Sequence, residues 1–83
     1  MKTMTDNEKM VLKALVENAQ SEGDNGVEYC MESVALELGR SIHSITGTCS
    51  SLEAKDYIEC WNNHYYFDGQ VNEEAIEWYN NNF

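Results

Sequence analysis

The chain contains no proline, and only five of its 83 residues are basic, against fifteen acidic ones. Without proline there is no obvious linker, so we expect a single domain over residues 1–83. A chain of this length buries one modest core and leaves no room for a large enzyme cleft. The formal net charge of −10 repels nucleic acid and anionic membranes, and it favours a soluble protein that is monomeric or weakly associating.

Long apolar runs are also missing, which argues against a membrane span, and the first ten residues lack the apolar core of a secretion signal. We therefore expect a cytoplasmic protein. Cys30, Cys49 and Cys60 are odd in number and form no CxxC motif, so neither a disulfide framework nor a zinc knuckle is indicated. His43 and His64 could in principle complete a metal site, but we expect reduced, buried cysteines and no cofactor. The sequence shows no pattern that pairs a nucleophilic side chain with a general base, so we do not expect an enzyme.

The N-terminal part of the chain has the pattern of an amphipathic helix. Thr5 followed by Glu8 is a capping box, in which each side chain binds the other residue's free amide. The apolar residues that follow repeat at helical spacing and predict a helix over residues 6–19. Residues 20–26 carry two glycines and no periodicity, which predicts a loop, and residues 27–30 are expected to form a short strand.

The middle of the chain predicts two short helices joined by a tight turn. Residues 31–38 form the first helix, and Gly39 supplies the left-handed conformation that ends it. Ser41 is the expected N-cap of the second helix. Its apolar stripe consists of Ile42, Ile45, Cys49 and Leu52, which should face the core. This is the helix-turn-helix pattern, spanning residues 30–55.

The C-terminal part predicts a β-hairpin and a last helix. Residues 57–61 and 64–67 are aromatic or β-branched, and Asn62-Asn63 between them suits a two-residue turn. Asn72 is the expected cap of a helix over residues 72–82. The predicted fold is therefore mainly α with a small β-hairpin wing over residues 57–67, an α+β winged helix-turn-helix. Its order is helix, short strand, two helices, two strands and helix.

Residues 33–58 resemble the MarR-like family of winged-helix transcription regulators. The family carries a leucine-alanine pair, a leucine-glycine stop, a serine-rich restart and a leucine before the wing. The matching residues here are Val34-Ala35, Leu38-Gly39, Ser41 with Ser44-Ile45-Thr46, then Leu52 and Tyr57-Ile58.

The resemblance implies that the exposed side of the second helix of the motif enters a DNA major groove and that the wing contacts the backbone or the minor groove. It also implies homodimer contacts through terminal helices, here Trp78, Tyr79 and Phe83. The residues expected to bind DNA or another partner are Arg40, Ser41, His43, Ser44, Thr46, Gly47, Ser50, Ser51, Lys55, Asn62, Asn63 and His64.

This chain departs from the family at three places. Gly47 stands where arginine is common, Asp56 stands where glycine is common, and the wing tip has no arginine. A glycine inside a helix costs about 1 kcal/mol, so Gly47 either lets a ligand approach closely or packs against the preceding helix.

Two functions follow from these patterns. The first is a small DNA-binding regulator of phage or mobile-element type, because residues 39–52 contain no acid and carry Arg40. The second is an acidic module that binds a basic protein, as a DNA mimic or inhibitor, because useful DNA affinity needs several lysine or arginine contacts to phosphates.

Overall fold

The N-terminal helix begins at the predicted capping box. The computed structural model describes residues 3–22, 25–61 and 68–83. Helix α1 covers Asp6–Glu22. The Thr5 amide donates to Glu8 Oε1 at 2.8 Å, and the Glu8 amide donates to Thr5 Oγ1 at 3.1 Å, which confirms the box. The helix runs past its predicted end at residue 19, because no glycine interrupts it before residue 23.

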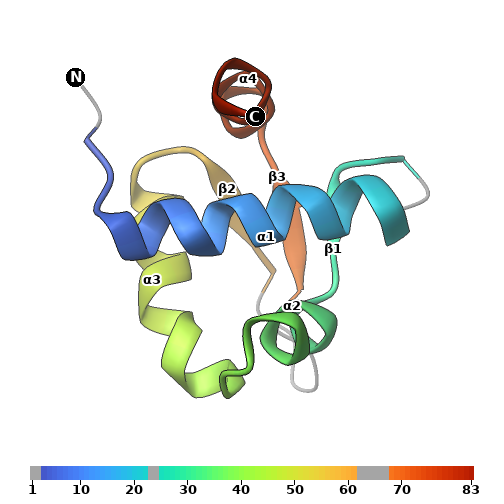
Figure 1. The fold of residues 1–83 in the computed structure, drawn as a ribbon, viewed down its shortest axis with the longest axis vertical. Coiled ribbons are helices and arrows are strands. Elements are labelled where there is room, and N and C mark those ends of the chain that lie inside the picture. The colour runs from blue at the N-terminus through green and yellow to red at the C-terminus, as the bar shows by residue number, and fades with distance from the viewer. Residues whose placement is uncertain (1–2, 23–24, 62–67) are drawn as a thin grey trace.

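Helix α1 is the element against which the others pack. In Figure 1 it crosses in front of the three strands, with α2 (Met31–Leu38) and α3 (Ile42–Ala54) on one side and α4 (Glu73–Asn82) on the other. The side chains on its packed side are completely buried: Val11, Leu12, Leu15, Val16 and Ala19. Each such burial stabilises the fold by about 1.5–3 kcal/mol for the larger side chains, so this stripe is a major part of the core.

The two middle helices have the predicted positions. Helix α2 ends at Gly39, whose φ of 66° and ψ of 32° are left-handed, and the Arg40 amide donates to the Ala35 carbonyl at 3.0 Å. Ser41 then caps α3 by accepting a hydrogen bond from the Ser44 amide. The predicted helix-glycine-helix arrangement over residues 30–55 is therefore present.

The first turn of α2 is held by side chains from distant parts of the chain. Cys30, its N-cap residue, provides no side-chain cap. Instead, Asn18 Oδ1 accepts from the Cys30 amide at 2.8 Å, and Asp68 Oδ1 accepts from the Met31 amide at 3.0 Å. The carboxylate of Asp68 is also well placed against the positive end of the helix dipole.

A small antiparallel sheet lies behind α1. Its strands are β1 (Glu28–Tyr29), β2 (Ile58–Cys60) and β3 (Gly69–Val71), in the order β1-β3-β2. Ile58 pairs with Val71, and both are buried. The architecture is therefore α+β, mainly helical with a three-stranded antiparallel sheet.

The predicted two-residue turn of the hairpin is wrong. A turn at Asn62-Asn63 would place Trp61 opposite His64, but the Trp61 amide donates to the Asp68 carbonyl at 2.8 Å and Cys60 pairs with Gly69. Burial of the apolar side chains of Ile58 and Val71 on the inner face sets this register. Residues 62–67, including the predicted strand at 64–67, lie outside the described part of the chain.

The last helix starts where predicted, but its cap differs. Asn72 is the N-cap residue of α4, yet its side chain makes no capping bond. Its Nδ2 donates instead to the Asp56 carbonyl at 3.0 Å, and its amide donates to the Tyr57 carbonyl at 2.9 Å. Asp56 itself has a φ of 65°, so a left-handed residue does occur where the resembled family places glycine.

The ion pair between Glu8 and Lys55 gives a pH-dependent prediction. Lys55 Nζ lies 2.8 Å from both Glu8 oxygens, and this hydrogen bond, followed by that from the Thr5 amide, holds the Glu8 pKa below its usual value of 4.5. A lowered folded-state pKa means that the charged form stabilises the fold above about pH 4.5, and that this contribution is lost as the pH falls through the folded-state pKa.

We expect Glu8→Gln to lower the free energy of unfolding at neutral pH by about 1–2 kcal/mol, because it removes the charge and weakens the cap. The difference from wild type should disappear at strongly acidic pH, as measured by urea denaturation across a pH series. Glu77→Gln, which removes an exposed carboxylate on α4, is the control and should leave the pH dependence unchanged. A difference between wild type and Glu8→Gln that stays constant with pH would contradict this assignment.

Candidate functional site

The two sides of α3 differ as the apolar stripe predicts. Ile45 and Leu52 are completely buried and Cys49 is 2% exposed, while Ile42 is half-buried. The opposite side faces solvent at His43, Ser44, Gly47, Ser50 and Ser51, with Thr46 half-buried at its edge. The hydroxyl-rich side of the helix is therefore available to a partner.

The hydroxyl groups on the exposed side of α3 differ in whether they already form hydrogen bonds within the protein. Ser44 Oγ donates to the Ser41 carbonyl at 2.8 Å, and Thr46 Oγ1 donates to the Ile42 carbonyl at 2.7 Å. Both oxygens keep lone pairs that can accept a further hydrogen bond. Within the described residues the hydroxyls of Ser50 and Ser51 have no hydrogen-bond partner, so both can donate and accept.

Gly47 lies in the middle of the exposed side. A Cβ atom at this position would have no heavy atom within 4 Å apart from its chain neighbours and the nearby backbone of its own helix. The alternative in which Gly47 allows close packing against α2 is therefore wrong. Within the described part of the chain no close packing requires a glycine here, which leaves the other alternative, close approach of a ligand, open.

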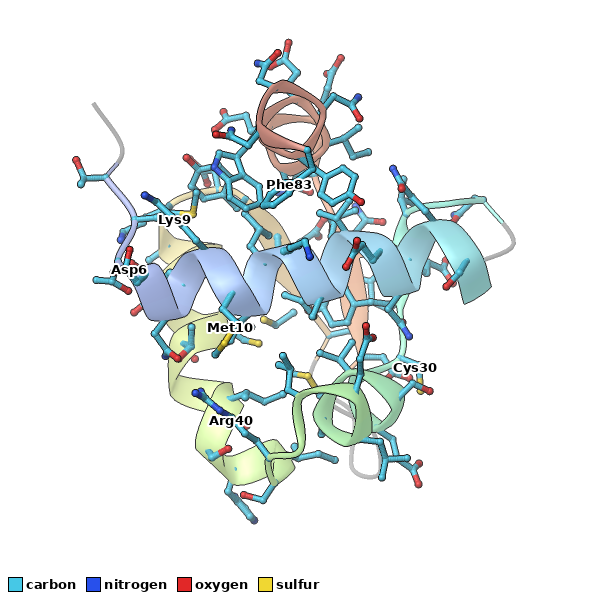
Figure 2. All side chains as sticks on the ribbon, viewed as in Figure 1. Asp6, Lys9, Met10, Cys30, Arg40 and Phe83 are labelled. Carbon is cyan, nitrogen blue, oxygen red and sulfur yellow. The ribbon has the colours of Figure 1, made fainter. Side chains whose placement is uncertain are left out.

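The two cations expected to flank this side have different surroundings. Lys55 is used inside the protein, because its Nζ contacts both Glu8 oxygens and donates to the Thr3 carbonyl at 2.8 Å. Arg40 is exposed at the turn between α2 and α3, and its Nη1 donates to Asn7 Oδ1 at 2.8 Å. Figure 2 shows Arg40 on the same side of α1 as α2 and α3.

Asn7 is a residue that sequence reasoning missed. Besides accepting from Arg40, it donates from Nδ2 to Thr48 Oγ1 at 2.9 Å. The three side chains come from α1, the inter-helix turn and α3. The sequence contains no local signal for this contact, because 41 positions separate Asn7 from Thr48.

A cleft of about 70 Å³ lies between α3, the start of α2 and the end of β2. Glu53 supplies a carboxylate whose Oε2 accepts from the Cys60 amide at 2.8 Å, and Trp61 is 38% exposed. The lining residues are Met31, Thr46, Cys49, Ser50, Glu53, Cys60 and Trp61.

The three cysteines are free thiols, and burial weakens the acidity of Cys49 and Cys60. Burial raises the pKa of Cys49 to about 12, and it also raises the pKa of Cys60, whose Sγ accepts from the Tyr29 hydroxyl at 3.8 Å. Both thiols therefore stay protonated at neutral pH, which is the condition of structural rather than reactive cysteines. Among the described residues, no group of three or more histidine, cysteine or acidic side chains converges as a metal site.

The remaining predicted site residues fall into two groups. Asn62, Asn63 and His64 lie outside the described residues. The aromatic residues of the last helix gather against α1, where the Phe83 ring stacks on Tyr79 at 5.3 Å and lies 5.1 Å from Lys13 Nζ. Trp78 and Tyr79 are half-buried, whereas Phe83 remains 62% exposed beside α1 (Figure 2).

No described helix has both the length and the apolar character needed to cross a membrane. Comparison with protein-family models, with curated proteins and with solved structures gives no match to this chain.

Two glycines give opposite predictions that test this geometry. Gly47→Ala should raise the free energy of unfolding by about 0.5–1 kcal/mol, because alanine favours the helix and its methyl group enters open space. Gly69→Ala should lower it by about 1–3 kcal/mol, because the new Cβ would overlap the Glu59 carbonyl and lie 2.9 Å from Tyr29 Cζ. Urea denaturation measures both, and a loss of stability in Gly47→Ala would show that the position is packed.

Proposed function

We propose that this chain is a winged helix-turn-helix domain that binds duplex DNA through the exposed side of α3, as a small transcription regulator of the MarR-like type. The order of elements supports the proposal, since a helix and a short strand precede the two helices of the motif and a strand pair and a last helix follow them. The third strand lies between the first two, and β2 packs against α3.

The observation that carries the proposal is the exposed side of α3, which contains no acidic residue from Ile42 to Leu52. A major groove admits an α-helix, and small hydroxyl side chains can bind phosphates or base edges there. Ser50 and Ser51 are exposed, and Gly47 leaves space for a phosphate or a base edge to approach the backbone. Arg40 adds a positive charge at the N-terminal end of this side.

The small number of cations sets the conditions for binding. One domain offers few phosphate contacts, so a homodimer that doubles them is part of the proposal, with contacts through Trp78, Tyr79 and Phe83. We place such a regulator in the cytoplasm, and a dimer would read a site with two-fold symmetry. Phe83 supports such a dimer, because its side chain is 62% exposed and leaves an apolar surface that a second copy could cover.

We expect the protein to bind a duplex selected from a random pool, and Ser50→Glu to reduce the affinity by tenfold or more, because a carboxylate there would face the phosphates. Ser21→Glu, which changes an exposed serine on α1, is the matched control and should bind like wild type. Fluorescence anisotropy at increasing salt provides the measurement. Wild-type protein that fails to bind any duplex at low salt would rule out this function.

A second candidate is an acidic module that binds a basic protein, and the cleft beside α3 favours it. Glu53 and the partly exposed Trp61 both line the cleft. A carboxylate beside an aromatic ring suits the cationic side chain of arginine or lysine. Lys55 and Lys13 lie near carboxylates of their own chain, which leaves fewer charges for phosphates.

For this candidate we expect a short arginine-rich peptide to shift the NMR signals of the Trp61 indole and of Met31. Glu53→Gln should weaken the peptide's binding by about tenfold, the scale of one charge-assisted hydrogen bond, while its amide oxygen can still accept from Cys60. Glu77→Gln removes an equal charge on α4 and serves as the control. Equal losses in the two variants would show that the peptide responds only to net charge.

A further inference from the structure

Arg40 is the only arginine in the chain, and its surroundings differ from those of two lysines. Lys55 Nζ lies 2.8 Å from a Glu8 oxygen, and Lys13 Nζ lies 3.9 Å from a Glu17 oxygen. Within the described residues, the partner of the Arg40 guanidinium is instead the neutral amide of Asn7. In a chain with fifteen acids, this cation is held in place without being neutralised.

The orientation of the Asn7 amide follows from the chemistry of its neighbours. A guanidinium has only donors, so the amide oxygen must face Arg40 and the amide nitrogen must face the other way. Thr48 Oγ1 accepts from that nitrogen at 2.9 Å. The threonine on α3 therefore fixes the amide that fixes the arginine.

The position of Arg40 suits an anionic ligand of α3. It directly precedes Ser41, the N-cap of α3, and it is exposed. A guanidinium has five N–H groups, and the hydrogen bond to Asn7 uses one of them. The other donors can form the paired hydrogen bonds that arginine makes with phosphate.

We propose that Asn7 is a positioning residue that presents Arg40, still fully charged, to a phosphate of the DNA backbone, and that this contact fixes the register of α3 in the groove. The inference rests on the DNA-binding function proposed above. Beyond that function, the inference names a DNA phosphodiester as the group that Arg40 binds, and it assigns a role to Asn7 on α1, which acts only through Arg40. Holding the side chain before binding reduces the conformational entropy that the contact costs.

Asn7→Asp tests the proposal, because the two residues have the same shape and differ in charge. The carboxylate would keep a hydrogen bond to Arg40 but neutralise it, and an acid in the first turn of α1 is favourable for the helix. We expect stability in urea to stay equal or rise, while affinity for the selected duplex falls by about tenfold. The slope of log affinity against log salt should decrease by about 0.9, the value for one phosphate contact.

A double-mutant cycle separates positioning from other effects. Arg40→Gln should lose the same affinity and the same part of the salt slope, and adding Asn7→Asp to it should change neither further. Lys9→Gln removes a positive charge on the exposed surface of α1, and Ser21→Glu adds a negative charge near the end of the same helix, so both serve as charge controls that should keep the wild-type slope.

Three results would contradict different parts of the proposal. If Asn7→Asp weakens DNA binding equally in the presence and absence of Arg40, the new charge repels the duplex directly and the positioning role is wrong. A salt slope that Arg40→Gln leaves unchanged would show that Arg40 contacts no phosphate. If wild-type protein binds no duplex at all, the failure lies with the proposed DNA-binding function, and the phosphate contact falls with it.

Discussion

The packing of α3 against α1 is the contact on which the rest of the site depends. The apolar side of α1 is buried, and α3 packs against α1 and buries Ile45, Cys49 and Leu52 in the same core. Because a helix repeats every 3.6 residues, burying these positions forces the serines and Gly47 outward. The same packing therefore fixes both sides of α3. A rotation of the helix that exposed the apolar stripe would also bury the serines and Gly47.

The fold distributes a small number of cations among different tasks. Lys55 joins the end of α3 to the start of α1 through Glu8, and Lys13 lies against the Phe83 ring at the end of α4. These two lysines therefore contribute to the packing of the helices. Arg40 is hydrogen-bonded to a neutral amide and keeps its charge at the surface. With a net charge of −10, this division determines how much positive charge α3 can offer an anionic ligand.

Asp68 connects the start of β3 to the start of α2. Its carbonyl accepts from Trp61 within the hairpin, and its carboxylate accepts from the first amide of α2. A displacement of the hairpin would therefore break a cap of α2. Gly69 allows this arrangement, because a side chain there would collide with Tyr29 and the backbone of Glu59.

The sequence by itself determined the features that rest on local chemistry. The capping box at Thr5, the glycine stop at Gly39 and the buried stripe of α3 each depend on residues within about three helical turns, and all three are present. Only the tertiary structure decided the hairpin register, the use of Asn72 and the pairing of Arg40 with Asn7. These contacts join positions far apart in the chain. Burial of Ile58 and Val71 sets the register, whereas the hydrogen bonds of Asn72 and Arg40 depend on groups that only folding brings together.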